Sequence, residues 1–246
     1  MTTLEDEVVI VTGASRGLGA SMAKRFAREG AAVTVTARSE SELEAVADEA
    51  ADAEGELLVA PADVTDESAV RAVVEATVAE HGSVTGLVNN AGIGLLNMYG
   101  EGSVLHEVDT ADFRQIVDVN VTGVFLFSKY AVPELIEAGR GNVLNVSSGL
   151  GRRGSARWGP YVASKWALEG MTRTQAQELD DHGINVNALD PGGRVETGFW
   201  DHLPESERDE ILDPDVMNDA ATTLLAQGPD GITGESMPVQ EWEDRL

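Results

Sequence analysis

The chain has 246 residues, 42% of them hydrophobic, which suits one α/β domain with a full apolar core and excludes a disordered chain. It carries 43 acidic against 17 basic side chains, a formal net charge of −26, so we expect no nucleic-acid partner because phosphate binding needs a basic surface. Cysteine is absent and the four histidines have no metal-binding spacing, so we also expect no metal.

The acidic residues are spread along the whole chain, which indicates a solvated acidic surface rather than a charged interaction tail. Repulsion across such a surface is screened in molar salt, where the Debye length falls to about 3 Å. We interpret the charge as adaptation to a salt-rich cytoplasm; the alternative is an acidic protein of an ordinary cell. No apolar run approaches the ~20 residues of a membrane helix, and the acidic N-terminus lacks a signal-peptide pattern. We therefore expect a cytoplasmic protein.

From the N-terminus onward, short apolar runs typical of buried strands alternate with segments of helical periodicity. The expected order is strand 8–11, helix 18–29, strand 33–36, helix 39–53, strand 57–60, helix 66–80, strand 86–89, long helix 109–138, strand 142–146, helix 161–181, strand 184–189, short helix 205–212, helix 215–226 and strand 236–239. This alternation predicts a doubly wound Rossmann fold, with one parallel sheet of about seven strands covered by helices on both faces. No linker divides the chain, so we expect a single domain, residues 1–246.

A glycine-rich turn joins the first expected strand to the first expected helix. Glycines allow a tight turn and close backbone approach to a pyrophosphate, and the helix N-terminus adds free N–H groups and the positive end of its dipole. The turn is therefore a candidate dinucleotide site; the alternative is a glycine-rich turn without a ligand. The candidate contacts are Gly13, Ser15, Arg16, Gly17, Leu18 and Gly19.

The end of the second strand bears on the choice between NAD and NADP. Proteins that bind NAD tend to place an acidic residue there for the adenosine ribose, whereas this chain has Arg38. Arg38 and Arg16 can flank a 2′-phosphate from two sides. The pair predicts NADP(H) as the cofactor; the alternative is two solvated arginines.

Tyr161 and Lys165 are four residues apart on an expected helix, so they share a face. A free phenol titrates near ~10, and a nearby ammonium lowers that pKa toward the range useful for proton transfer. Lys165 is also one of only three lysines, against fourteen arginines. The pair predicts acid/base chemistry at Tyr161; the alternative is a tyrosine packed in an interface.

Further motifs follow the glycine-rich turn in a fixed order: Asp63-Val64, Asn89-Asn90-Ala91-Gly92, Asn120, Ser147-Ser148, Tyr161-x-x-x-Lys165 and Pro191-Gly192. With this set and spacing the sequence resembles the short-chain dehydrogenase/reductase family, from the first expected strand to the sixth. The resemblance implies that Tyr161 protonates a carbonyl oxygen as hydride leaves the nicotinamide, that Ser148 hydrogen-bonds the same oxygen, and that Asn120 holds a water linking Lys165 to solvent. Ser147 is the alternative to Ser148.

The resemblance also implies further cofactor contacts. Lys165 would bind the nicotinamide ribose beside Tyr161. The remaining contacts would come from Asp63, Val64, Asn90, Ala91, Gly92, Pro191 and Gly192. For Asn89-Asn90 the alternative is a turn device without a ligand, since asparagine tolerates left-handed geometry.

Three features depart from the family. The segment after Pro191-Gly192 is one residue longer than usual, so either Thr197 or the Val195 backbone would contact the nicotinamide carboxamide. The expected lid, 198–213, carries large aromatics that would cover a substrate or pack on the core. The chain end lacks the family's frequent Asp-Gly-Gly.

Three arginines border the expected substrate pocket: Arg152, Arg153 and Arg157. They indicate an anionic or hydroxyl-rich substrate; the alternative, which we prefer, is that they form ion pairs with the acidic surface.

We therefore predict an NADP(H)-dependent enzyme that interconverts a small ketone or aldehyde and its alcohol by hydride transfer. One alternative is a 3-oxoacyl-thioester reductase acting on an acyl carrier protein. Another, from a different class, is a non-catalytic dinucleotide sensor on the same fold. The resemblance further implies a homo-oligomer, a dimer or tetramer, assembled through the long helices that hold Asn120 and Tyr161.

Overall fold

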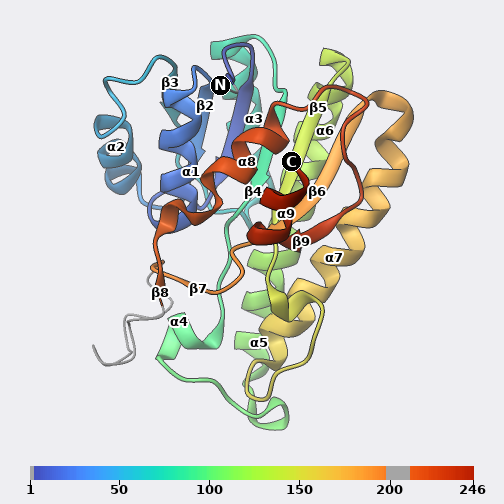
Figure 1. Ribbon diagram of the computed structural model, residues 1–246. Coiled ribbons are helices and arrows are strands. Elements are labelled where there is room, and N and C mark those ends of the chain that lie inside the picture. The colour runs from blue at the N-terminus through green and yellow to red at the C-terminus, as the bar shows by residue number, and fades with distance from the viewer. Residues whose placement is uncertain (1–2, 198–210) are drawn as a thin grey trace.

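Figure 1 shows the computed structural model, which describes residues 3–197 and 211–246. Seven parallel strands form one sheet in the order β3-β2-β1-β4-β5-β6-β9. They are β1 (Val8–Thr12), β2 (Ala32–Thr36), β3 (Glu56–Val59), β4 (Gly86–Asn89), β5 (Gly141–Val146), β6 (Ile184–Asp190) and β9 (Ser236–Pro238). The order of the strands reverses between β1 and β4, where open α/β sheets bind ligands at the carboxyl ends. The doubly wound fold predicted from the sequence is confirmed.

Helices connect successive strands and cover both faces of the sheet (Figure 1). They are α1 (Gly17–Arg28), α2 (Glu40–Asp48), α3 (Glu67–His81), α4 (Leu95–Tyr99), α5 (Thr110–Val117), α6 (Gly123–Ala138), α7 (Gly159–Leu179), α8 (Asn218–Leu225) and α9 (Val239–Arg245). A π-helical turn, Asp118–Thr122, joins α5 to α6. The three segments together form the long helix expected at 109–138.

The core consists of two apolar layers separated by the sheet. Val9 and Val11 of β1 face the layer formed with α1, α8 and α9, whereas Ile10 faces the layer formed with α3, α6 and α7. Successive residues of a strand point to opposite faces, so a strand covered on both sides must be apolar throughout. Each of the five residues of β1 is accordingly buried. This layering leaves the carboxyl ends of the strands as the edge where loops can form a site.

Several elements differ from the sequence-based expectation. Of the short helix expected at 205–212, the described residues Ile211–Leu212 form strand β8, which pairs with β7 (Arg194–Val195). The helix expected at 215–226 begins with a 3₁₀ turn, Pro214–Met217, before α8. Helices α4 and α9 were not expected. Helix α9 forms because Val239 and Trp242 are buried, and the Trp242 indole donates a hydrogen bond to the Ala188 carbonyl at 3.2 Å.

None of the helices in the described part of the chain combines the length and apolarity that a bilayer crossing requires. Within residues 3–197 and 211–246, no cluster of three or more histidine, aspartate or glutamate side chains is arranged to hold a metal ion.

Candidate active site

A cleft of about 1540 Å³ runs along the carboxyl ends of the strands, with walls formed by the loops that follow them. Most residues singled out from the sequence line it: Gly13, Ser15, Arg16, Leu18, Arg38, Asp63, Val64, Asn90, Ala91, Gly92, Ser148, Tyr161, Lys165, Pro191, Gly192, Val195 and Thr197. Gly17, Gly19 and Asn120 lie behind this lining. The parallel sheet brings these distant segments together because all the strands end at the same edge.

The glycine-rich turn packs too closely for side chains. Gly13 and Gly17 have φ angles of +65° and +57°, in the left-handed region that favours glycine. A Cβ on Gly19 would lie 2.4 Å from the Gly13 carbonyl oxygen. The Arg16 side chain does not cap α1, so the first N–H groups of this helix remain available to an anion at the cleft.

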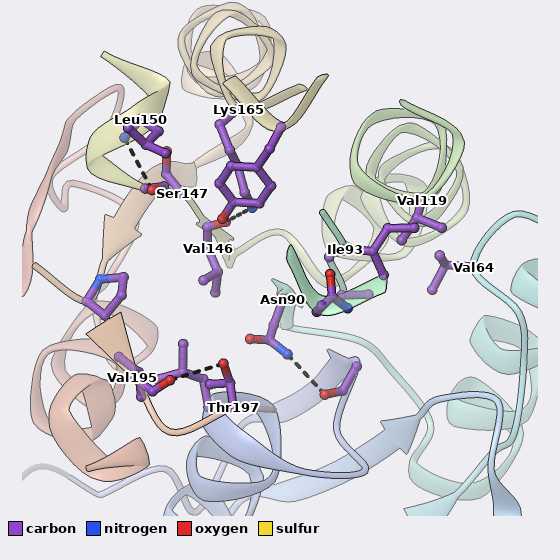
Figure 2. Close-up of a pocket in the computed structure, with 18 of the residues that line it drawn as sticks. Val64, Asn90, Ile93, Val119, Val146, Ser147, Leu150, Lys165, Val195 and Thr197 are labelled. Carbon is purple, nitrogen blue, oxygen red and sulfur yellow. Dashed lines mark hydrogen bonds between the residues drawn. The ribbon is translucent and has the colours of Figure 1, made fainter. Parts of the chain in front are cut away.

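The loop after β4 is tied to the glycine-rich turn by Thr12 and Asn90. Thr12 Oγ1 accepts hydrogen bonds from the backbone N–H groups of Asn90 and Ala91 at 2.9 and 3.0 Å. The Asn90 amide donates to the Thr12 carbonyl at 2.8 Å and to the Gly13 carbonyl at 3.1 Å, as Figure 2 shows in part. The Asn90 side chain therefore holds the glycine-rich turn and the loop after β4 together, and the backbone around Gly92 lines the cleft.

Arg16 and Arg38 are exposed at the cleft and have no acidic partner within 4 Å among the described residues. Eight other lysine and arginine side chains of the described residues form ion pairs, as Lys24 does with Glu49 at 2.6 Å. Asp63, at the same end of the cleft, accepts hydrogen bonds from Thr65 N and Oγ1. In a chain of net charge −26, this end of the cleft thus presents two uncompensated guanidinium groups.

Tyr161 lies in the first turn of α7 and Lys165 one turn later. The Lys165 Nζ lies 5.6 Å from the centroid of the Tyr161 ring and donates a hydrogen bond to the Val146 carbonyl at 2.7 Å (Figure 2). Burial lowers the Lys165 pKa to about 8, and the negative charge of Glu169 opposes this shift. Lys165 is therefore held between the end of β5 and the phenol.

The phenol keeps its proton near neutrality in the ligand-free protein. Burial raises the pKa of Tyr161 to about 12; a hydrogen bond with Ser148 acts against that shift, and the charge of Asp190 adds to it. The Trp158 ring stands edge-on to the Tyr161 ring at a centroid distance of 5.8 Å. A protonated phenol is the form that can donate to a carbonyl oxygen.

The two adjacent serines after β5 have different surroundings. Ser147 is buried, and its hydroxyl donates to Glu169 Oε1 at 2.5 Å. Ser148 is partly exposed in the cleft, where its Oγ accepts from the Leu150 N–H at 3.2 Å and it hydrogen-bonds Tyr161. Ser148 is therefore the hydroxyl that can reach a substrate oxygen beside the phenol.

Asn120 is buried in the π-helical turn between α5 and α6. Its side chain accepts from the Ile93 N–H at 2.8 Å and donates to the Ile93 carbonyl at 2.9 Å and to Ser164 Oγ at 3.0 Å. A Cβ on Gly92 would lie 3.5 Å from Asn120 Oδ1 and 3.8 Å from Lys165 Nζ. Asn120 thus connects the β4 loop with α7 directly behind Lys165.

The segment after β6 reaches back across the cleft. Asp190 Oδ1 accepts a hydrogen bond from the Gly192 N–H at 2.8 Å, and the Val195 carbonyl accepts one from Thr197 Oγ1 at 3.2 Å. Thr197 packs on the glycine-rich turn, since a Cβ on Gly17 would lie 2.9 Å from Thr197 Cγ2. Both Val195 and Thr197 thus line the cleft beside the glycine-rich turn. The aromatics expected in the lid, Phe199 and Trp200, lie outside the described residues.

The three arginines of the loop after β5 behave differently from one another. Arg152 forms ion pairs with Asp190 and Glu169, which are buried. The prediction that this arginine pairs with acidic residues at the surface is therefore wrong. Arg157 donates to the Gly102 carbonyl at 3.1 Å. Arg153 lines the cleft without an acidic partner within 4 Å in the described part of the chain. Sequence reasoning missed Glu169 and Asp190; the spacing of Glu169, four residues after Lys165, was the available signal.

A glycine-rich turn and a protonated phenol beside a lysine, at one end of a Rossmann sheet, are the arrangement of an oxidoreductase that uses a nicotinamide dinucleotide. The family model described as short chain dehydrogenase matches residues 7–208. The chain therefore belongs to the short-chain dehydrogenase/reductase family, whose members act on alcohols and carbonyl compounds, and the resemblance noted in the sequence is confirmed.

Similar proteins within this family differ in substrate and cofactor. The 3-oxoacyl-[acyl-carrier-protein] reductase FabG of Thermotoga maritima is 36% identical over 85% of this chain and 82% of its own length. The NADPH-dependent pterin aldehyde reductase of Arabidopsis thaliana is 38% identical over 94% and 92% of the two chains. The crystal structure of carveol dehydrogenase from Mycobacterium avium in complex with NAD is 26% identical, with a TM-score of 0.89 over 97% and 98% of the chains.

Proposed function

We propose that this protein is an NADP(H)-dependent carbonyl reductase, which reduces a small ketone or aldehyde or oxidises the corresponding alcohol. The observation that carries the cofactor choice is the pair Arg16 and Arg38, which lack acidic partners among the described residues although the chain has 43 acidic side chains. A guanidinium binds a phosphate through several charge-assisted hydrogen bonds, so a 2′-phosphate would compensate both. The whole chain, residues 1–246, would act as one catalytic domain.

The residues present fit the dinucleotide. The uncapped first turn of α1 and the glycines of the turn suit a pyrophosphate, and the loop backbone at Gly92 allows close approach. Asp63 and Val64 line the cleft and would hold the adenine, and Lys165, beside Tyr161, would bind the nicotinamide ribose. Pro191, Gly192, Val195 and Thr197 would border the carboxamide. When bound, the cofactor supplies or accepts the hydride.

The side chains of this protein would carry the proton. Tyr161 donates its phenolic proton to the substrate oxygen, because its raised pKa keeps it protonated at neutral pH. Ser148 donates a hydrogen bond to the same oxygen. Lys165 stabilises the phenolate that results, and Asn120 holds the loop behind Lys165, where a water can link the amine to solvent.

A 3-oxoacyl-thioester reductase is the second candidate, because the Thermotoga maritima relative reduces such a thioester on an acyl carrier protein. Against it, a carrier protein that is itself acidic would be repelled by a surface of net charge −26 at low ionic strength. Molar salt screens that repulsion, so charge alone does not separate the two candidates.

We also propose a salt-adapted cytoplasmic homo-oligomer. Large apolar side chains are exposed on the long helices, with Phe125 of α6 at 52% and Trp166 of α7 at 53% exposure. Burial of these rings in a second copy would remove apolar surface from water.

The deciding experiment is a turnover screen in molar salt with NADPH and with NADH against ketones, aldehydes and an acetoacetyl thioester. We expect NADPH oxidation with ketones or aldehydes and weaker turnover with NADH. Preferential turnover of the thioester would favour the second candidate. Tight NADPH binding without turnover of any substrate would favour a dinucleotide sensor and overturn the enzymatic proposal.

A further inference from the structure

Behind the catalytic side chains, a single guanidinium lies between two buried carboxylates. Arg152 pairs with Asp190, whose side chain is 4% exposed, and its Nη1 lies 3.5 Å from Oε1 of Glu169, whose side chain is 2% exposed. The same Nη1 donates to Ser236 Oγ at 2.9 Å. Removing one partner from an ion pair with a buried carboxylate leaves that charge without compensation. Arg152, Asp190 and Glu169 therefore depend on one another.

The members of this group belong to the elements that carry the reacting side chains. Arg152 follows Ser148 within one short 3₁₀ turn. Asp190 ends β6 directly before Pro191 and accepts a hydrogen bond from the Gly192 N–H. Glu169 lies on α7 one turn beyond Lys165 and accepts from both Ser147 and Ser236. Arg152 therefore joins the Ser148 loop, the end of β6, the start of β9 and the catalytic helix.

The electrostatic effect of these carboxylates reaches the proton donor. The groups around Tyr161 are Lys165 on its own helix, Ser148 after β5 and the Trp158 ring, and Asp190 at the end of β6 lines the same cleft. The charge of Asp190 raises the pKa of Tyr161. Glu169 acts in the same sense on Lys165, since its charge opposes the lowering of that pKa.

Among the residues that the structure describes, two cations contact Asp190 or Glu169, and of these Arg152 contacts both acids. Arg173 Nη2 lies 3.3 Å from Glu169 Oε2, and its side chain is 55% exposed, so solvent screens it. Within the described residues, Arg152 is the cation paired with Asp190. Neutralisation of the charge beside Tyr161 therefore depends on Arg152.

We propose that Arg152 is a positioning residue for proton transfer: it holds the Ser148 loop against the end of β6 and neutralises the Asp190 carboxylate, which lines the same cleft as Tyr161. This inference rests on the proposed role of Tyr161 as proton donor. It assigns to Arg152, whose side chain lines the cleft, a function in the reaction that is exerted through Asp190 and the Ser148 loop. The carboxylate of Asp190 orients the Pro191-Gly192 segment, and Arg152 cancels the charge that this carboxylate would otherwise impose on the phenol.

The test is the pH dependence of kcat/KM for alcohol oxidation with saturating NADP⁺, in which the rising limb reports the ionisation of the proton-accepting group. Arg152→Met leaves Asp190 unneutralised, so we expect the limb to move up by about one pH unit. Asp190→Asn keeps an oxygen for the Gly192 N–H but removes the charge, so the limb should move down. In the double variant the limb should return to within a few tenths of a pH unit of the unsubstituted protein.

Arg173→Met is the matched control, because it removes the other arginine that contacts Glu169 and leaves Asp190 paired; we expect no shift of the limb. Arg152→Lys keeps the positive charge and should restore most of the profile. If Arg152→Met does not fold, as judged by circular dichroism and NADPH binding, the shift in Asp190→Asn and its reversal in the double variant carry the test.

Unchanged profiles in Asp190→Asn and in a folded Arg152→Met variant would overturn the role given to Arg152. A double variant that stays as displaced as Arg152→Met would also overturn it, because the effect would then come from packing and not from charge. Absence of any alcohol oxidation by the unsubstituted protein would instead contradict the proposed function, so the two failures are distinguishable.

Discussion

Lys165 Nζ lies 5.6 Å from the centre of the Tyr161 ring and is held there by a hydrogen bond of 2.7 Å to the carbonyl of Val146. The end of β5 therefore fixes the position of the amine relative to the phenol. The same burial that brings the two side chains together lowers the pKa of the lysine to about 8 and raises that of the tyrosine to about 12. Both shifts favour the neutral form, so the phenol keeps the proton that it would donate, and the lowering of the Tyr161 pKa that the sequence led us to expect from the Lys165 ammonium is not found.

Loss of the phenolic hydroxyl should abolish turnover without loss of the cofactor site. Replacement of Tyr161 with phenylalanine keeps the ring that packs against Trp158 but removes the proton donor. General acid catalysis contributes about 10²- to 10⁴-fold, so we expect kcat to fall by that factor. NADPH affinity, measured by fluorescence titration, should change by a few-fold or less. Tyr130→Phe is the control and should retain full activity, because Tyr130 is a half-buried tyrosine outside the cleft whose hydroxyl donates to Glu67. Comparable turnover by the Tyr161→Phe enzyme would refute the proton-donor role.

Reversal of charge at Arg38 should separate the two cofactors. With Arg38→Asp, an aspartate would repel a 2′-phosphate and could accept from ribose hydroxyls, so we expect the Kd for NADPH to rise about ten- to a hundredfold. The Kd for NADH should stay within about threefold, because NADH lacks the phosphate that the substitution repels. Arg28→Asp makes the same change of charge at the C-terminal end of α1, away from the cleft. It should change the Kd of neither cofactor. Equal losses of NADPH and NADH affinity would contradict a phosphate-binding role for Arg38.

The pKa of Lys165 predicts a pH-dependent contribution to folding. In the unfolded chain the lysine keeps its proton to about pH 10.5, whereas in the folded protein it loses the proton at about pH 8. Between these values the unfolded state binds more protons, so the contribution of Lys165 to the free energy of unfolding rises with pH. Below pH 8 both states are protonated, and the cost of burying the ammonium is present in full.

We therefore expect the free energy of unfolding of the unsubstituted protein to gain about 1–2 kcal/mol over Lys165→Met between pH 8 and pH 10. Urea denaturation of both proteins without cofactor, in molar salt, measures this difference. Below pH 8 the difference between the two proteins should be constant. Parallel curves across the whole range would show that Lys165 titrates as an exposed lysine does.

Salt should stabilise this protein through screening of its net charge of −26. At 0.1 M salt the Debye length is about 10 Å, so neighbouring surface carboxylates repel one another, whereas at 1 M it is about 3 Å. We expect the thermal midpoint to rise by about 10 °C or more between 0.1 and 2 M KCl, since each ~2–4 °C corresponds to ~1 kcal/mol in a chain of this size. An equal rise in sucrose would indicate solute exclusion instead of charge screening, and an unchanged midpoint would favour an acidic protein of an ordinary cell.

The sequence by itself was sufficient for the Rossmann fold, the glycine-rich turn and the Tyr161–Lys165 pair. Parallel strands buried on both faces must be apolar throughout, so runs such as that of β1 are visible in the sequence, and helical spacing alone places Lys165 one turn after Tyr161. These are properties of neighbouring residues. The elements that were misjudged, such as α9, depend on a distant partner: the bond from Trp242 to Ala188 cannot be seen in either segment alone.

Only the tertiary structure decided which polar groups face the cleft. Glu169 engages the hydroxyl of Ser147 and so leaves Ser148 as the serine beside the phenol. Arg152 forms ion pairs with two buried carboxylates, Asp190 and Glu169, where the sequence indicated a surface pair or a substrate contact. The physical reason is that burying a charge or hydroxyl is tolerated only with a partner of suitable geometry. Those partners come from strands and helices that are far apart in the chain and meet only when the sheet has formed.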